Sequence, residues 1–200
     1  AFVLVACRMV LRTLRHGQGD LACIGYVAYM TAMSVMKRPY PDCYRMGQLA
    51  LRMAEQRDNP YFRLTVYQYF PAFYQHWCEP LADTLPYLEQ GMALGQRGIN
   101  PLSAGYATLL LAVNRFVLGA ELEALEADVE QGLQFLKRSR QPHTEAMLRY
   151  GVLQGLRALR GRSLSPLSFD SEDCSSSEFF KGDYRSPSIP LALHSAAMLR

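Results

Sequence analysis

Three dipeptides that end in proline recur at a fixed interval along the chain. Asn59-Pro60, Asn100-Pro101 and Gln141-Pro142 follow one another at intervals of 41 residues. Asparagine can accept hydrogen bonds from the free N–H groups at a helix start, and proline at the first helical position gives up a donor that would have no partner. Each dipeptide therefore predicts the start of a helix.

Glycines predict where several helices end. Gly119 and Gly161 close the apolar stretches ATLLLAVNRFVLG and MLRYGVLQGLRALRG, and a glycine directly after a periodic stretch is a helix stop. Asp20, close to one period before Asn59, can cap another helix. The combined signals predict eight helices, at residues 1–16, 20–38, 41–57, 60–77, 80–97, 101–118, 121–139 and 142–160.

This pattern predicts an all-α fold, because no stretch shows convincing strand alternation. A fixed period near 41 residues indicates an α-solenoid of tetratricopeptide-like (TPR-like) antiparallel helix hairpins, with about four hairpins in residues 1–161. The stretch SLSPLSFDSEDCSSS predicts a Ser/Asp-rich loop over 162–178. Residues 179–200 are expected to start a further, truncated helical repeat. Both ends interrupt apolar patterns, so we expect self-association through cut ends.

Two prolines lie inside predicted helices. Pro71 would remove the hydrogen bond to the Tyr67 carbonyl and bend the helix over 60–77. Pro86 allows either a kinked helix or one that starts late with Thr84 as its cap. The sequence leaves this choice open.

An aromatic stripe runs along the predicted helix over 60–77. Its members are spaced four, four, three and four residues apart, and they are Phe62, Val66, Phe70, Phe73 and Trp77. Tyr67 and Tyr74 fall on a neighbouring line. Such a stripe normally packs inside a solenoid layer; the alternative is a ligand or partner surface that includes Tyr67, Tyr74 and Trp77.

The charge pattern argues against nucleic acid and membrane partners. The 21 basic and 18 acidic residues are interspersed, with a formal net charge of +3 and no long basic run, so no nucleic-acid partner is expected. The longest uncharged run, residues 21–36, is short for a membrane span.

Charged residues cluster at the two ends of the predicted helix over 121–139. Acidic residues crowd its start and basic residues its end, which complements the helix dipole. We interpret this pattern as a solvated helix face. The residues concerned are Glu121, Glu123, Glu126, Asp128, Lys137, Arg138 and Arg140.

The motifs of common enzymes and metal sites do not occur. The chain has no G-x-x-x-x-G-K-[ST] loop, no G-x-S-x-G, no H-E-x-x-H and no kinase catalytic loop. We therefore expect no catalytic, cofactor-binding or metal-binding residue. None of the five cysteines forms a Cys-x-x-Cys pair, and their apolar settings suggest buried free thiols of a reducing, cytoplasmic compartment; they are Cys7, Cys23, Cys43, Cys78 and Cys174.

Three stretches resemble the TPR-like helical region of large bacterial multidomain signalling proteins. They are HWCEPLADTLPYLEQGMALGQRGIN, MLRYGVLQGLRALRG and KGDYRSPSIPLALHSAAM, and the resemblance covers residues 20–160 best. In that family a Ser/Thr-kinase-like domain and an AAA-type predicted ATPase precede this region, and a GAF domain with a histidine kinase or diguanylate cyclase follows it. The Gly98-Ile99-Asn100 turn and the Ser-rich stretch depart from the family pattern.

The resemblance implies a non-catalytic scaffold or coupling segment within a kinase or ATPase parent chain. Its partners would be neighbouring domains of the same chain or another protein. Two alternatives stay open: a sensory domain that binds a small molecule or peptide near Tyr67, Tyr74 and Trp77, and the repeat domain of an ATPase-linked transcriptional regulator.

Overall fold

The computed structural model describes residues 2–17, 19, 21–35, 40–165, 168, 170, 171 and 175. The regular elements within these residues are all helices, which confirms the predicted all-α class. The chain divides into two compact units, Ala1–Asn114 and Arg115–Arg200. In the described part of the chain, no helix combines the length and apolarity that crossing a bilayer requires.

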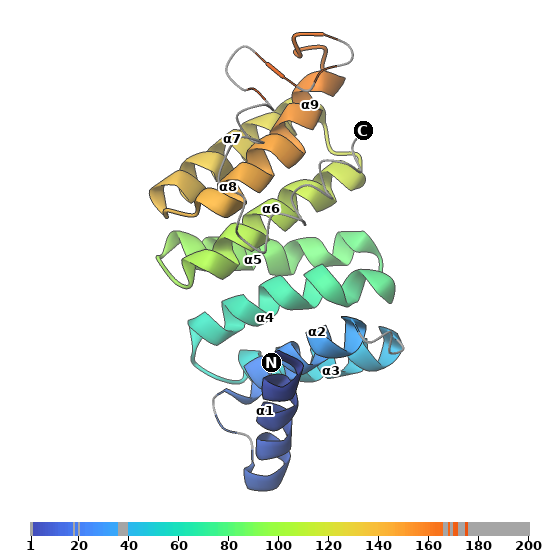
Figure 1. The fold of residues 1–200 in the computed structure, drawn as a ribbon, viewed down its shortest axis with the longest axis vertical. Helices are drawn as coiled ribbons and strands as arrows, with labels where there is room; N and C mark the ends of the chain where they lie inside the picture. Colours follow the sequence, from blue (N-terminus) through green and yellow to red (C-terminus); the bar gives the residue numbers. More distant parts are fainter. Residues whose placement is uncertain are drawn as a thin grey trace. The chain divides into compact units, whose positions relative to one another are not determined.

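The first unit consists of consecutive helices that pack on their neighbours in the sequence. α1 contacts α2, α2 contacts α3, α3 contacts α4, and α4 contacts α5, as Figure 1 shows. Apolar side chains from α2, α3 and α4 form the main core. The elements are α1 (Phe2–His16), α2 (Ala22–Val35), α3 (Tyr40–Glu55), α4 (Pro60–Phe73), η1 (Gln75–Trp77), η2 (Leu81–Thr84), α5 (Leu85–Gln96) and most of α6 (Pro101–Val117).

The second unit contains a long helix packed against a helical run with a π-helical centre. α7 spans Leu122–Arg138, and it contacts α8 (Pro142–Leu148), the π-helical segment η3 (Arg149–Leu153) and α9 (Gln154–Leu159). The run from α8 to α9 agrees with the single helix predicted over 142–160. The helical repeat predicted over 179–200, like Asp20 and Cys174, lies outside the described residues.

The three Pro dipeptides mark helix starts as predicted. Pro60, Pro101 and Pro142 are the first residues of α4, α6 and α8. Asn59 caps α4 through Oδ1, which accepts from the N–H groups of Tyr61 (3.1 Å) and Phe62 (3.4 Å).

The capping chemistry differs at the other two starts. Asn100 Oδ1 accepts from the Ser103 N–H at 3.3 Å. Gln141 makes no side-chain cap bond; its Nε2 donates instead to the Ser139 carbonyl at 3.4 Å. The prediction was therefore right for the position of all three starts and for the capping role of the two asparagines.

The two helix ends at Gly119 and Gly161 follow the predicted glycine pattern, and the end of α7 does not. Gly119 and Gly161 have φ of 78° and 71°, the left-handed conformation that glycine adopts without strain. Arg140 takes the same place after α7 with φ of 53°. The Gln141 N–H then bonds to the Leu136 carbonyl at 3.0 Å, so an arginine closes this helix in a conformation that favours glycine.

The predicted helix over 60–77 ends early. α4 stops at Phe73, because Tyr74 leaves the helical conformation with φ of −132°. Val66 and Phe70 are buried, whereas Phe73 and Trp77 are exposed. The prediction of one continuous stripe through Trp77 was therefore wrong, since Trp77 lies on the separate short helix η1.

The helix predicted over 80–97 also divides. The 3₁₀ helix η2 precedes α5, so Pro86 lies in the first turn of a helix that starts late. Thr84 makes no cap bond; its hydroxyl donates to the Leu81 carbonyl (2.6 Å) and accepts from Asn114 Nδ2 (2.8 Å). The open choice at Pro86 is thus resolved in favour of the late start.

Candidate partner-binding surface

Tyr67 and Tyr74, two of the three aromatic residues predicted for a binding surface, lie in the core of the first unit. Tyr67 is 5% exposed, and its ring lies 5.5 Å from that of Tyr87. Tyr74 is fully buried, with its hydroxyl 2.8 Å from Thr31 Oγ1. Burial raises the pKa of both phenols, so both stay neutral at ordinary pH. These two rings stabilise the core and do not line a shared surface with Trp77.

Trp77 is the predicted residue that reaches the surface. Its side chain is 57% exposed, and it stacks on Tyr40, which is 43% exposed. The two ring centroids are 4.8 Å apart with an interplanar angle of 20°. The Trp77 ring also contacts the His76 ring, and the centroids of these two rings are 4.8 Å apart. We call Tyr40, His76 and Trp77 the aromatic cluster.

A hydrogen-bonded turn fixes the position of Trp77. The buried Gln75 donates from Nε2 to Glu79 Oε2 (2.7 Å) and to the Asp83 carbonyl (3.1 Å). The backbone carbonyl of Gln75 accepts from the N–H groups of Cys78 (2.9 Å) and Glu79 (2.8 Å). Residues 75–83 are therefore tied together around one side chain, which limits the motion of η1.

Tyr44 joins this turn to α3. Its hydroxyl donates to Glu79 Oε1 and accepts from Gln48 Nε2 at 2.7 Å. Burial, followed by the hydrogen bond to Glu79, raises the pKa of Tyr44 to about 12, so the phenol keeps the proton that it donates. Tyr44 follows Tyr40 by one helical turn, on the same side of α3. The bond therefore holds together the two elements that carry the aromatic cluster.

The aromatic cluster has the chemistry of a protein-docking site. Tryptophan and tyrosine dominate the residues that contribute most to protein–protein binding. A pair of rings held in place before binding loses little conformational entropy when a partner arrives. A partner surface around Trp77 stays a prediction; the structure adds Tyr40 and His76 to it and removes Tyr67 and Tyr74 from it.

The cysteines and histidines of the described residues do not gather into a metal centre. No group of three or more His, Cys, Asp or Glu residues that could hold a metal ion occurs there. Cys23 and Cys43 are buried, Cys7 is partly buried and Cys78 is exposed, and these four cysteines form no disulfide with one another. Burial, the largest influence, raises the pKa of Cys43.

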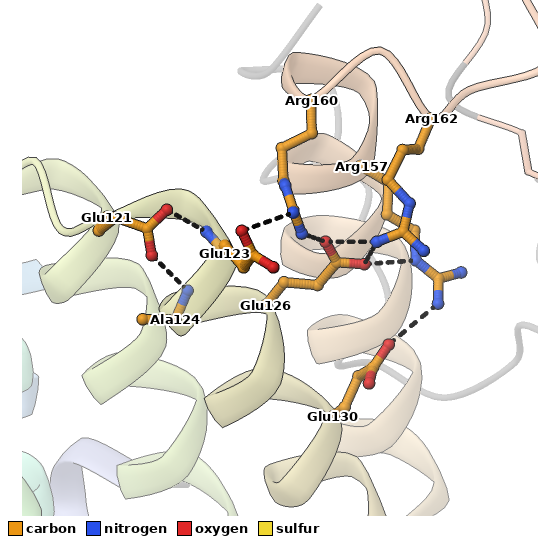
Figure 2. A network of polar contacts seen from close by, with 8 residues as sticks. All are labelled: Glu121, Glu123, Ala124, Glu126, Glu130, Arg157, Arg160 and Arg162. Atoms are coloured by element: carbon orange, nitrogen blue, oxygen red, sulfur yellow. Dashed lines mark hydrogen bonds and ion pairs between the residues drawn. The ribbon is translucent and has the colours of Figure 1, made fainter.

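A buried carboxylate in the second unit binds three arginines. Glu126, on α7, is only 3% exposed. Its carboxylate accepts from Arg157 Nε (3.2 Å), from Arg162 Nη1 (2.9 and 3.0 Å) and from Arg160 Nη1, as Figure 2 shows. The network joins the last residues of the α8–α9 run to the start of α7.

The pKa of Glu126 reflects two opposed effects. Burial is the largest single influence and raises it, but the hydrogen bonds from Arg160 and Arg157 and the charge of Arg162 together lower it below its ordinary value. Glu126 is therefore ionised at neutral pH. The network has the features of a structural clamp, because the charge-assisted hydrogen bonds of three guanidinium groups join two helical segments through one buried carboxylate.

The interpretation of this helix face as solvated was wrong for Glu126. Glu121, Glu123 and Asp128 are exposed as predicted. Glu121 also caps α7, since its carboxylate accepts from the N–H groups of Glu123 (2.9 Å) and Ala124 (2.6 Å), and these two bonds lower the pKa of Glu121. The partners of Glu126 lie 31 to 36 residues further along the chain, so the local charge pattern could not reveal its burial.

The sequence analysis missed Tyr40 as the stacking partner of Trp77 and the three arginines as the partners of Glu126. Tyr40 begins α3 next to two prolines, a position that indicates a helix start and says nothing about stacking.

No family model, no curated protein and no solved structure matches the chain.

Proposed function

We propose that the chain is an α-solenoid of TPR-like hairpins that acts as a non-catalytic scaffold. In this proposal it docks a protein partner, either another domain of the same chain or a separate protein, within a larger bacterial signal-transduction protein of the predicted ATPase and sensor-kinase type. The cytoplasm is the compartment proposed for it.

The repeat proposal is supported by the starts of α4, α6 and α8 at Pro60, Pro101 and Pro142. A recurrent start at the same interval is what a stack of similar hairpins requires, because each hairpin repeats one supersecondary unit. The packing of α1 to α5, each on the next, is consistent with this arrangement.

The docking proposal depends on one observation, the exposed stack of Trp77 on Tyr40. Aromatic rings are enriched among the residues that contribute most to protein–protein binding, and rings held in place before binding lose little entropy when a partner covers them. The hydrogen bonds around Gln75 and Glu79 hold the stack in one place, as a preformed binding surface requires.

Photo-cross-linking inside cells tests this proposal. A photoreactive phenylalanine analogue at position 77 should give a discrete protein adduct, whereas the same analogue at Tyr61, which is 52% exposed on α4, should not. Tyr40→Ala should reduce the yield at position 77, because it removes the other half of the stack. Equal yields at positions 77 and 61, or no protein adduct at 77, would contradict the docking proposal.

A further inference from the structure

α1 carries an exposed apolar seam next to the face that it uses for packing. Leu4, Cys7, Leu11 and Leu14 are spaced three, four and three residues apart, which places them in one row of a helix. Leu4, Leu11 and Leu14 are 57%, 49% and 68% exposed. An open row with this spacing is the seam that a second helix covers in a coiled coil.

The packed face of α1 is a different one. Ala6 and Val10 are buried, and Met9 lies so close to α2 that a Cβ at Gly25 would come within 3.2 Å of the Met9 Cβ. α1 lies at one end of the first unit and packs on α2 (Figure 1). The contact with α2 therefore leaves the row of Leu4, Leu11 and Leu14 open.

The charges beside the seam are all of one sign. Arg8 and Arg15 each follow a seam residue directly, at the flanking positions whose charges select the partner in coiled coils. Arg12 and His16 are also exposed, and α1 contains no acidic residue. A partner that fits both features has a leucine seam of its own with acidic residues beside it.

We infer that the seam of α1 docks an amphipathic helix of a protein partner, with Glu or Asp at the positions that face Arg8 and Arg15. This inference rests on the proposed scaffold function and names a second surface for it. Apolar contacts at Leu4, Leu11 and Leu14 supply the affinity, and the arginines select an acidic partner over a basic one.

The charges disfavour one other occupant, a second copy of α1, and the narrowness of the seam disfavours another, a bilayer surface. In an antiparallel pair of two α1 helices, Arg8 and Arg15 of one copy would face the arginines of the other, which costs free energy. A bilayer surface prefers a wide apolar arc that lies flat. Phe2, Val3 and Val5 are also exposed at the start of α1, but beyond this first turn the seam is bounded by Arg8 and Arg15 on one side and by α2 on the other.

Two designed peptides test the inference on the full chain. Each peptide has three heptads with Leu at the two seam positions, a and d, of every heptad. One peptide carries Glu at all flanking e and g positions, and the other carries Lys there. In low salt, fluorescence anisotropy should show that the Glu peptide binds about tenfold more tightly than the Lys peptide, since two ion pairs replace two repulsive pairs. Arg8→Glu/Arg15→Glu should reverse this preference.

A seam variant controls for folding. Leu11→Gln/Leu14→Gln should abolish binding of the Glu peptide while leaving the circular dichroism and the thermal midpoint unchanged, because both side chains are exposed. Equal binding of the two peptides, binding of neither, or a preference that survives the arginine reversal would overturn the inference.

The other occupants are tested with the same variants. Tighter binding to phosphatidylglycerol vesicles than to the Glu peptide, or a dimer in sedimentation that Leu11→Gln/Leu14→Gln dissociates, would each overturn the inference. Failure of the Glu peptide together with a protein adduct at position 77 would reject this surface alone. Failure of both would reject the scaffold proposal as well.

Discussion

Gly47 on α3 lies directly against the ring of Phe70 on α4. A Cβ at Gly47 would come within 2.6 Å of Phe70 Cδ2 and 2.8 Å of its Cε2, which is closer than carbon atoms pack. The absence of a side chain at Gly47 therefore allows α3 and α4 to approach each other, and this approach helps to bury Phe70 in the core beside Tyr74.

Gly47→Ala should destabilise the first unit. We expect a loss of about 1–3 kcal/mol in the free energy of unfolding, because the added methyl group overpacks the contact. Urea titration measures the loss. Phe70→Leu is the matched second change: in the double variant the smaller side chain makes room, so the combined loss should be smaller than the sum of the two single losses. Additive losses would contradict the contact.

Asn59→Ala should cost about 1 kcal/mol of stability, because it removes the side-chain cap of α4. Gln141→Ala, at the equivalent place before α8, should change stability by less than about 0.5 kcal/mol, since Gln141 makes no cap bond. Thermal and urea unfolding of the two variants measure the difference. Equal losses would show that the two helix starts are capped alike.

Arg140→Gly should stabilise the chain by about 0.5–1 kcal/mol, because glycine adopts the left-handed conformation at this helix end without strain. Gly119→Ala is the converse change at a comparable end and should destabilise by about 1 kcal/mol. Differential scanning calorimetry measures both. A stabilised Gly119→Ala variant would be inconsistent with the observed φ at that residue.

Glu126→Gln should destabilise the second unit by about 2–3 kcal/mol at neutral pH, because three guanidinium groups lose their shared carboxylate. Glu123→Gln is the matched control; its side chain is 78% exposed and its single ion pair with Arg160 spans 3.4 Å, so the loss should stay below about 0.5 kcal/mol. Urea midpoints of the two variants provide the comparison.

The contribution of Glu126 should depend on pH in the acidic range only. Its pKa in the folded chain is lowered from the ordinary value of 4.5, so the unfolded chain takes up a proton first as the pH falls. The stabilisation is then fully present above pH 4.5 and is lost as the pH falls through the lowered pKa. Unfolding of wild type and Glu126→Gln at pH 7, 4.5 and 3 should show a converging difference; a constant difference would contradict the assignment.

The local signals in the sequence predicted the helices well and the sites poorly. Asn59, Pro60 and Gly119 act through their own backbone neighbours, so their effects can be read from adjacent residues. The stacking of Trp77 on Tyr40 and the binding of Glu126 by Arg157 join residues more than 30 positions apart. Such pairs depend on tertiary packing, which a helical periodicity does not specify.

The early end of α4 shows the same limit. The spacing of Phe62, Phe70 and Trp77 is compatible with one helix, yet the hydroxyl of Tyr74 pairs with Thr31 on α2. That contact accompanies the break after Phe73, and Trp77 lies on the separate short helix η1. Trp77 is consequently exposed at the surface, whereas Phe70, which belongs to the same predicted stripe, is buried.

The most direct test of the proposed repeat scaffold is a set of three distances between equivalent positions. Gln56, Arg97 and Arg138 are exposed and lie 41 residues apart, near the ends of α3, α5 and α7. Spin labels attached through a keto amino acid at pairs of these positions can be measured by electron–electron double resonance. A solenoid predicts similar distances for the pairs 56/97 and 97/138 and a clearly longer distance for the pair 56/138. A 56/138 distance no longer than the other two would contradict the repeat architecture.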